Sequence, residues 1–367
     1  MSLLRYHWRK WIGPLRLDLP LALALLALVL AGLAVLHSAA NGDLRVVRSQ
    51  AIRDGIGLLA LLGLTRVPPQ RLKQWALWAY LASLLLLLLV PVFGTGRSGQ
   101  HWLYLGAFYI QPAELMKLSV PLAVAAYLGT RPLPPRWLEL LASCLIIGLP
   151  TALIAVQPDL GTAILVAASG VFVVFFAGIA WWRVGLLAGI AALCAPLVWN
   201  FVMQDYHRRR FLSFMNPEAD PLGDGWNIIQ SKIAVGSGGL WGHGWGQGTQ
   251  ARLEFLPEHT TDFIFAVLAE DFGFIGVCAI LMLYLFIIGR SLWISANARD
   301  SFGRMLGAAL TLTLFVYVVV NAAMITGLLP VVGVPMPLIS YGGTSAVTLL
   351  AGFGIILSLH AWRKRQY

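Results

Sequence analysis

The sequence predicts an all-α, polytopic membrane protein with about ten transmembrane helices and one long periplasmic loop. Three observations lead to this prediction. Of the 367 residues, 59% are hydrophobic and only 11% are charged, whereas soluble domains carry roughly 25% charged residues. Apolar runs such as 17–36 and 75–93 approach the ~20 residues that a helix needs to cross a bilayer core. These runs are unbroken, which excludes a transmembrane β-barrel, whose strands alternate apolar and polar residues.

Ten apolar segments are interpreted as spans. They cover about 17–37, 51–65, 74–93, 113–128, 138–156, 161–180, 184–203, 262–289, 305–327 and 341–361. An even number of spans returns both termini to one side of the membrane. We interpret residues 1–367 as a single integral membrane domain that contains the large loop 204–261.

The basic residues indicate the orientation of the spans. Lys and Arg gather in four connecting or terminal segments: 65–73, 129–137, 290–304 and the C-terminal tail. The connections 157–161 and 328–340 carry neither residue. Cytoplasmic loops are enriched in Lys and Arg, so both termini are expected in the cytoplasm of a bacterial cell and the loop 204–261 outside. The connection with Arg45, Arg48 and Arg53 opposes this orientation without reversing the balance.

The net charge of +10 does not indicate a nucleic-acid partner, because its basic residues are spread over short connections and no basic face with stacking aromatics is visible. The long loop instead contains the segment 226–242, whose spacing predicts an amphipathic helix at the membrane surface. Loops this long inside a compact protein are usually functional. Three cysteines, each within an expected span, are interpreted as small apolar residues.

Two segments place acids at the outer ends of spans. In "QPAELMKL" (111–118), Glu114 and Lys117 share one helical face, and are either a structural ion pair, a wall of a substrate pocket, or both. In "QPDLGTA" (157–163), Asp159 is placed to cap the helix that follows, or to take part in catalysis or in holding a divalent cation.

Arginines near the outer surface form a second group of candidates. Arg208, Arg209 and Arg210 lie in "HRRRF" (207–211), and Arg48 is also on the outer side. Such residues either reach ordinary lipid phosphates or bind a pyrophosphate, which matches the guanidinium fork. The sequence leaves both interpretations open.

The segment "LPEHTTDFIFAVLAEDFGFIG" (256–276) concentrates acids in a chain that has few. Asp262 stands at the mouth of a long span, where partly apolar surroundings raise the pKa of a carboxylate and make it a better base. Helix capping is the alternative role. Glu270 and Asp271 lie deeper and are expected to bond to neighbouring helices or backbone.

The segment "PMPLISYGGTSAV" (335–347) predicts an irregular backbone that enters the last span. Such a backbone is tolerated at membrane depth where it is buried or lines a cavity. Ser340 and Ser345 are its candidate substrate-binding residues, and tight helix packing through small residues is the alternative. Zinc-protease, serine-elbow and Walker motifs are absent from the sequence.

Four motifs in this order, "QPAELMKL", "QPDLGTA", "FLPEHTTDFIFAVLAEDFGFIG" and "PLISYGGTS", resemble the SEDS family (shape, elongation, division and sporulation proteins) over nearly the whole chain. The short tails are similar to those of the elongation branch. The resemblance implies a membrane peptidoglycan glycosyltransferase that polymerises lipid II on the periplasmic face of the bacterial inner membrane. It implies Asp262 as the essential carboxylate and functional roles for Glu114 and Lys117.

The resemblance also implies a divalent cation, Mg²⁺ or Mn²⁺, with unknown ligands. It implies a class B penicillin-binding protein as the crosslinking partner, alongside other proteins of the elongation complex and the membrane lipids. Two alternatives to a glycosyltransferase remain at this point. One is a flippase that carries lipid II across the membrane, which ten spans would suit; the other is a non-catalytic scaffold for wall enzymes.

Overall fold

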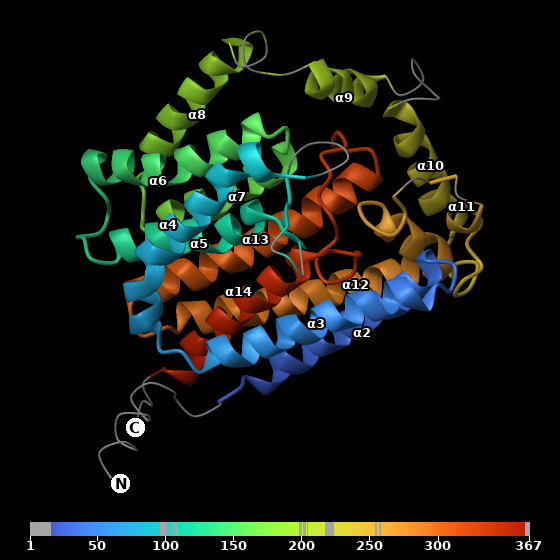
Figure 1. The fold of residues 1–367 in the computed structure, drawn as a ribbon, viewed down its shortest axis with the longest axis horizontal. Helices are drawn as coiled ribbons and strands as arrows, with labels where there is room; N and C mark the ends of the chain where they lie inside the picture. Colours follow the sequence, from blue (N-terminus) through green and yellow to red (C-terminus); the bar gives the residue numbers. More distant parts are fainter. Residues whose placement is uncertain are drawn as a thin grey trace.

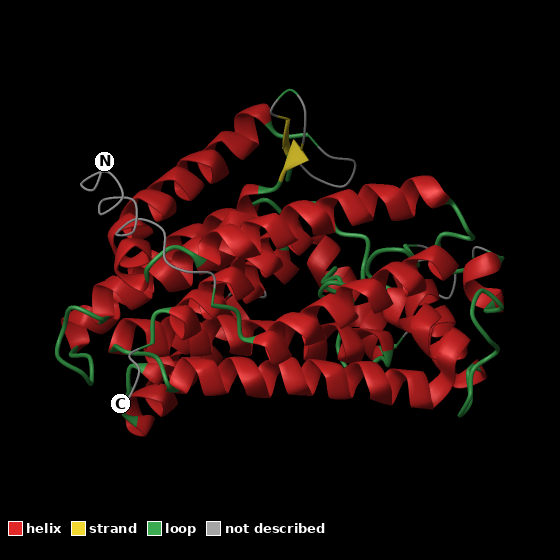
Figure 2. Cartoon of the chain, turned by 90° about the horizontal axis from the view of Figure 1, so that it is seen from below, coloured by secondary structure: helices red, strands yellow, loops and turns green. Residues whose placement is uncertain are grey.

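The computed structural model describes residues 16–95, 101–104, 106, 109–197, 200, 203, 205–216, 224–253, 255–256 and 258–363. Helices supply almost all of the regular structure in these residues (Figures 1 and 2). The strands β1 (Leu103–Tyr104) and β2 (Tyr109–Ile110) pair antiparallel in a small hairpin beside the helices. The prediction of an all-α fold is confirmed.

Each of the ten expected spans corresponds to one helix. These helices are α2 (Leu19–Ala39), α3 (Leu44–Thr65), α4 (Pro69–Phe93), α5 (Pro112–Leu128), α6 (Trp137–Val156), α7 (Leu160–Phe176), α8 (Trp181–Leu197), α12 (Ile264–Ala296), α13 (Ser301–Ile325) and α14 (Thr344–Ala361). Within the described residues, six of them are long and apolar enough to cross a membrane by length and composition: α2, α4, α6, α12, α13 and α14. The polytopic character of the chain is thereby established.

Helix α3 begins earlier than the sequence indicated. The expected span started at residue 51, but α3 begins at Leu44 because the side chain of Asp43 accepts a hydrogen bond from Arg45 N (2.8 Å) and caps the first turn. The polar first turns, including Arg48, are therefore helical.

The helices pack around α5 and α13, which contact each other at the centre of the bundle. Helix α13 also packs against α7 and α12, while α2 lies along α12 and α3 lies along α14 (Figure 1). Helix α8 leans away from the bundle in Figure 1, and side chains such as Trp181 and Leu193 are exposed on it.

The connection between α13 and α14 lies against two helices through glycines. A Cβ at Gly161 of α7 would lie 2.4 Å from the carbonyl oxygen of Val332, and a Cβ at Gly32 of α2 would lie 2.3 Å from that of Leu338. Both distances are too short for a non-bonded contact, so a residue with a Cβ atom does not fit at either position without a shift of the backbone. The two glycines therefore allow the irregular backbone to sit inside the bundle, where its polar groups find partners.

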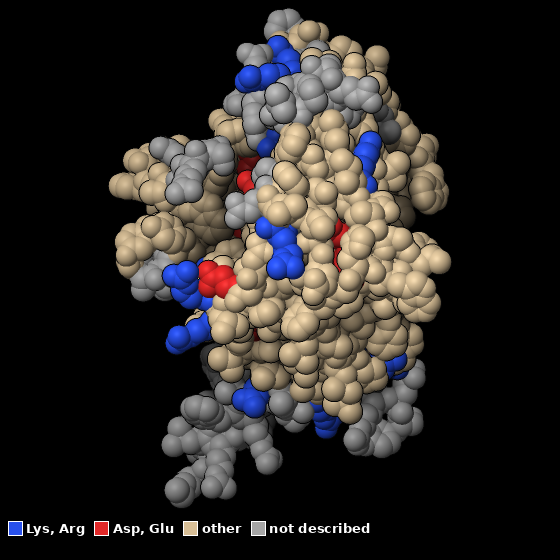
Figure 3. All heavy atoms as spheres, turned by 90° about the vertical axis from the view of Figure 1, so that its right-hand side faces the viewer, with Lys and Arg blue, Asp and Glu red and all other residues tan. Residues whose placement is uncertain are grey.

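The large loop contains the helices α9 (Asp205–Met215), α10 (Asp224–Ser237) and α11 (Thr249–Arg252). Helix α10 is the helix expected within 226–242, and it packs against α12 and α13. Its buried Ser231 donates a 3.0 Å hydrogen bond to the carbonyl of Ile325. Figure 3 faces the end of the molecule where α10 and α11 lie, a mostly uncharged surface with few acidic side chains in view.

Glu270 and Asp271 hold the end of this loop, which confirms their expected bonding to backbone. Glu270 Oε1 accepts hydrogen bonds from Thr249 N (2.6 Å) and Gln250 N (3.1 Å) at the start of α11. Asp271 accepts from Gly248 N (3.0 Å) and from the hydroxyl of Ser38. Both carboxylates are buried, so they serve as internal anchors.

Candidate active site

A cavity of about 210 Å³ collects most of the acids that the sequence singled out. We name it the polar cavity, and the polar side chains that define it are Gln111, Glu114, Lys117, Asp159, Asp262 and Ser345. These residues come from α5, the start of α7, the segment before α12 and the start of α14. Motifs more than 200 residues apart in the sequence thus meet in one site.

Asp262 lies two residues before α12 and is partly exposed. Its backbone is held by the segment that precedes α14. Tyr341 N donates to the carbonyl of Thr260 (2.8 Å), and the hydroxyl of Ser340 donates to that of Thr261 (2.6 Å). Asn321 Nδ2 donates to the carbonyl of Asp262 itself (2.9 Å). Three consecutive residues are therefore fixed, while the Asp262 carboxylate remains on the cavity wall.

Burial raises the pKa of Asp262 to about 7, from 3.8. The neighbouring charges of Glu258 and Asp159 also raise this pKa, while Arg210 lowers it. A carboxylate with a pKa near neutral pH is both substantially ionised and basic enough to accept a proton from a hydroxyl group. The site thus offers a general base at physiological pH.

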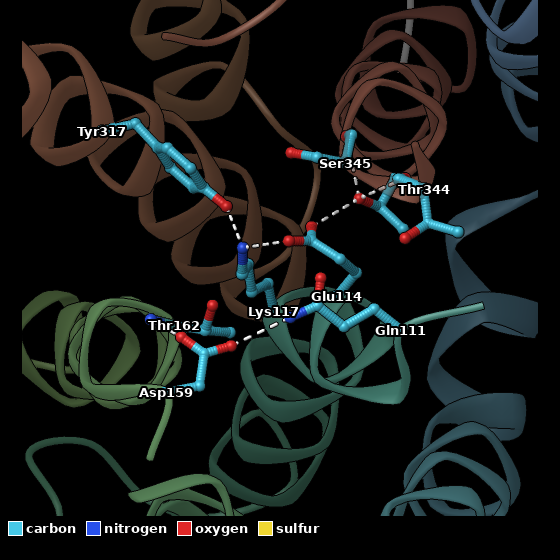
Figure 4. Close-up of polar contacts among 9 residues, drawn as sticks. Gln111, Glu114, Lys117, Asp159, Thr162, Tyr317, Thr344 and Ser345 are labelled. Carbon is cyan, nitrogen blue, oxygen red and sulfur yellow. Dashed lines mark hydrogen bonds and ion pairs between the residues drawn. The ribbon is translucent and has the colours of Figure 1, made fainter. Parts of the chain in front are cut away.

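Asp159 performs the capping role that the sequence allowed. Its Oδ1 accepts a hydrogen bond from Thr162 N (3.0 Å) at the start of α7, and its Oδ2 accepts from Gln111 Nε2 (2.9 Å), as Figure 4 shows. The same carboxylate lines the polar cavity. Capping and a place in the site therefore coexist.

Glu114 and Lys117 form an ion pair inside the bundle. Lys117 Nζ lies 2.5 Å from Glu114 Oε1, and both residues are buried, with 6% and 4% of their surface exposed. Lys117 also donates to the hydroxyl of Tyr317 (Figure 4). Thr348 Oγ1 donates to Glu114 Oε2 (3.2 Å). The pair links α5 to α13 and α14 and lines the polar cavity. A structural pair thus also shapes the site.

The two candidate serines are placed differently. Ser345 lines the polar cavity. Ser340 is buried behind Asp262, where its hydroxyl donates to the carbonyl of Thr261 and accepts from Met336 N (2.8 Å). The geometry therefore gives Ser340 a supporting position and Ser345 a position on the cavity wall.

Among the described residues, the candidate arginines do not line the polar cavity. Arg48 is exposed on α3, and Arg209 is exposed on α9. Arg208 Nη2 donates to the carbonyl of Asn200 (2.9 Å). Arg210 Nη1 donates to the carbonyl of Val331 (3.1 Å), and its charge acts on Asp262, so Arg210 lies nearest the site.

A second cavity, of about 1030 Å³, adjoins the first. We name it the apolar cavity, and its apolar lining includes Ile56, Trp102, Ile110, Leu115 and Val347. Trp102, Thr261, Tyr341 and Gly343 line both cavities. Arg53 also lines the apolar cavity. In the sequence, Arg53 stood out only as an exception to the expected orientation of the spans, although an arginine within an apolar segment is itself a signal of function.

Asn321 is a second residue that sequence reasoning missed. Its amide donates to the carbonyls of both Asp262 and Val334 (2.7 Å). The available signal was a polar amide within the apolar run 305–327, since polar residues inside spans mark sites or packing contacts.

The described residues contain no group of three or more His, Cys, Asp or Glu side chains suited to hold a metal ion. Asp159 and Asp262 are two carboxylates on one cavity and interact electrostatically. Oxygen ligands of this kind suit Mg²⁺, but further ligands for a cation would come from a bound substrate.

Fold and site together define a polytopic helical membrane protein with an acidic cavity at the mouths of its helices. The model of the family FTSW_RODA_SPOVE, described as "Cell cycle protein", matches residues 15–365. The chain therefore belongs to the FtsW/RodA/SpoVE family, the SEDS proteins, and is a multi-pass protein of the bacterial inner membrane.

Individual relatives agree with this assignment. The peptidoglycan glycosyltransferase MrdB of Escherichia coli K12 is 46% identical over 349 residues, covering 95% of this chain and 94% of the relative. A chain from a structure reported as "Structural coordination of polymerization and crosslinking by a peptidoglycan synthase complex" superposes with a TM-score of 0.83 at 35% identity, covering 96% of this chain and all of that one. The crystal structure of the Rod shape determining protein RodA of Thermus thermophilus gives a TM-score of 0.73 at 31% identity, with 96% of this chain and 99% of that one covered.

Proposed function

We propose that this chain is a peptidoglycan glycosyltransferase that polymerises lipid II into glycan strands during cell elongation, with Asp262 as its general base. The observation that carries the proposal is a partly exposed carboxylate with a pKa of about 7 on the wall of a polar cavity. The relatedness to MrdB over nearly the full chain supports the same activity.

The reaction joins the 4-hydroxyl of an acceptor N-acetylglucosamine to C1 of a donor N-acetylmuramic acid, and undecaprenyl pyrophosphate leaves with the electron pair of the broken C–O bond. A hydroxyl is a weak nucleophile, so a base must take its proton as the new bond forms. Asp262 accepts this proton at its carboxylate. Its loop is held by Asn321, Ser340 and Tyr341, so little reorganisation is needed at the moment of reaction.

Positive charge must balance the departing pyrophosphate. Lys117 lines the polar cavity, and Arg210 is close enough to affect Asp262. A divalent cation, Mg²⁺ or Mn²⁺, bound with the substrate would add to this charge. Asp159, which lines the same cavity, is the carboxylate that would share such an ion with the substrate oxygens, while Asp262 stays free to accept the proton.

The basic connections favour an orientation with both termini in the cytoplasm and the polar cavity at the periplasmic face. Lipid II reaches that face from the membrane, so a cavity at the mouths of α12 and α14 is suitably placed. The similarity to a chain of a peptidoglycan synthase complex supports a class B penicillin-binding protein as the partner that crosslinks the strands.

The test is polymerisation of lipid II by the purified protein with its partner and Mg²⁺ or Mn²⁺, read as glycan ladders on a gel. We expect ladders from the wild type and none from Asp262→Asn. Asp300→Asn is the matched control, because Asp300 also precedes a long helix and caps α13 through Gly303 N (3.0 Å), far from the site. Equal ladders from Asp262→Asn would exclude this residue as the base. Lipid II exchange between vesicle leaflets without any ladder would support a flippase instead.

A further inference from the structure

Leu338 has a backbone conformation that leucine rarely adopts. It lies in the connection between α13 and α14, and its φ of 59° falls in the left-handed region, where a bulky residue is a genuine outlier. Its side chain is buried, so Leu338 is not part of an ordinary surface turn. Such a conformation persists only where the surrounding structure imposes it, and it is often found at functional sites. The contacts around Leu338 are therefore of interest.

Two helices that lie side by side contact the connection at this point. Tyr284 of α12 is buried, with 1% of its surface exposed, and its hydroxyl donates a hydrogen bond to the carbonyl of Pro337. Gly32 of α2 faces the next two residues, because a Cβ there would lie 2.3 Å from the Leu338 oxygen and 2.9 Å from Ile339 Cα. Tyr284 and Gly32 thus hold the strained backbone against α12 and α2.

The strained residue lies within a turn, 336–340, that is closed by its own hydrogen bonds. Ser340 N donates to the carbonyl of Met336 (3.0 Å), and Met336 N donates to Ser340 Oγ (2.8 Å). The two ends of the turn are therefore tied to each other. A displacement at Pro337 or Leu338 would be transmitted to Ser340, because the closed turn leaves little room for local adjustment.

The turn 336–340 in turn holds the segment that carries the base. The Ser340 hydroxyl donates to the carbonyl of Thr261 (2.6 Å), and Tyr341 N donates to that of Thr260 (2.8 Å). Asp262 follows these two residues directly. A continuous path of hydrogen bonds and backbone thus runs from the Tyr284 hydroxyl to the segment of Asp262.

Tyr284 acts at a distance from the chemistry. It is not among the described residues that line the polar cavity. A general base must be held within hydrogen-bond reach of the proton that it accepts, and a displacement of about 1 Å can reduce a rate roughly 10²-fold. A hydroxyl that fixes the supporting turn can therefore affect the rate without touching the substrate.

We propose that Tyr284 is a positioning residue for polymerisation: its hydroxyl holds the strained turn at Leu338, so that Ser340 and Tyr341 present Asp262 to the acceptor hydroxyl. This inference rests on the proposed function, since it takes Asp262 as the general base. Gly32 contributes by leaving space for the carbonyl of Leu338.

The experiment measures kcat and KM for lipid II with the purified full-length protein, its partner and Mg²⁺, together with the melting temperature in detergent. Tyr284→Phe removes only the hydroxyl and is expected to lower kcat about tenfold, while KM stays within about twofold of the wild type. Tyr80→Phe is the matched control, because the buried Tyr80 hydroxyl also donates to a carbonyl of another helix, that of Ile146 (3.0 Å). Both variants should lose similar thermal stability, but Tyr80→Phe should keep its kcat.

A second pair of variants disturbs the same turn from α2. Gly32→Ala brings a methyl group against the Leu338 carbonyl and is expected to lower kcat, again with little change in KM. Gly148→Ala is the control, because a Cβ at Gly148 of α6 meets no described atom within 4 Å, so its kcat should not change.

Equal kcat values for Tyr284→Phe and Tyr80→Phe would overturn the proposal. A rise in KM without a fall in kcat would also overturn it, because the hydroxyl would then serve substrate binding. If Tyr284→Phe does not fold, Gly32→Ala decides, and a wild-type kcat in that variant refutes the positioning role. Failure of both variants to fold would show a purely structural role and refute it as well.

The two proposals fail in different ways. A wild-type protein that makes no glycan contradicts the proposed function, and with it the base that Tyr284 is inferred to position. A polymerising wild type with an unchanged Tyr284→Phe contradicts only the role of Tyr284.

Discussion

Asn321 Nδ2 donates a 2.9 Å hydrogen bond to the carbonyl oxygen of Asp262, and the same nitrogen donates to the carbonyl of Val334. One buried amide on α13 thus joins the segment that carries Asp262 to the segment that precedes α14. The carboxylate of Asp262 takes no part in this contact, so the support and the chemistry of the residue are separate.

Replacing Asn321 with Ala is expected to lower polymerisation while the Asp262 carboxylate is retained. The change leaves two buried carbonyls without this donor, at about 1–3 kcal/mol of stability for an unsatisfied group, and a displacement of about 1 Å can reduce a rate roughly 10²-fold. The measurement is the initial rate of glycan synthesis, normalised to folded protein. Asn297→Ala, which removes only the local bond from Asn297 Nδ2 to Trp293 O (2.8 Å), should polymerise normally. Equal rates for Asn321→Ala and Asn297→Ala would refute the role of Asn321 in positioning Asp262.

The pH dependence of polymerisation should follow the pKa of Asp262. Because the base must be ionised, the rate is expected to rise with pH through about 7. Glu258→Gln removes a charge that raises this pKa, so the rising limb should move to lower pH. Arg210→Gln removes a charge that lowers it, so the limb should move to higher pH. A pH–rate profile for each variant tests the signs, and shifts in the same direction would contradict the electrostatic account.

The same pKa predicts the pH dependence of stability. The pKa of Asp262 is about 7 in the folded protein against 3.8 for an unperturbed side chain, so the native state holds the proton more tightly. The stabilisation from this group is full below about 3.8 and is lost as the pH rises through about 7. The melting temperature measured in detergent should therefore fall as the pH rises across this window. Asp262→Asn should flatten that dependence, and an unchanged slope would exclude Asp262 as its source.

Single substitutions of the Glu114–Lys117 pair should destabilise the protein strongly. Breaking a buried pair leaves an uncompensated group and costs about 3–5 kcal/mol, whereas replacing both members with uncharged side chains is far milder. We expect Glu114→Gln and Lys117→Met each to lower the melting temperature more than the double variant does. If the double variant folds well but makes no glycan, the Glu114–Lys117 pair is also needed in the polar cavity. If the double variant polymerises lipid II at the wild-type rate, the role of the pair is structural only.

Glu270→Gln is expected to affect stability rather than chemistry. Glu270 accepts backbone hydrogen bonds at the start of α11, and loss of a cap typically costs about 0.5–2 kcal/mol. The melting temperature should fall, while the rate per folded molecule should remain near that of the wild type. A rate that falls as far as that of Asp262→Asn, without loss of stability, would place Glu270 in the chemistry.

Sequence patterns were sufficient for the elements that depend on local composition. All ten spans appear as helices, because long apolar runs leave the backbone few ways to satisfy its hydrogen bonds in lipid. The earlier start of α3 was missed because its first turns are polar, and only the cap from Asp43 reveals them as helical.

Part of the candidate site was predictable because charged residues are rare in this sequence. Charged side chains at the ends of apolar runs stand out in the sequence. The structure places four of them on the polar cavity: Glu114, Lys117, Asp159 and Asp262. The place of Arg53 on the apolar cavity was not predictable, because it depends on which helices α3 packs against, although its position within an apolar run was a signal. Hydrophobic periodicity specifies that a face is buried, but the partner of that face is a tertiary property.

Tyr341 takes part in both halves of the site: its amide holds the Thr260 carbonyl, and its ring lies beneath Arg53. The segment that carries Asp262 and the guanidinium of Arg53 on the apolar cavity are therefore both in contact with this one residue. A substitution that moves Tyr341 would therefore alter the walls of the polar cavity and of the apolar cavity together, because its side chain lines both.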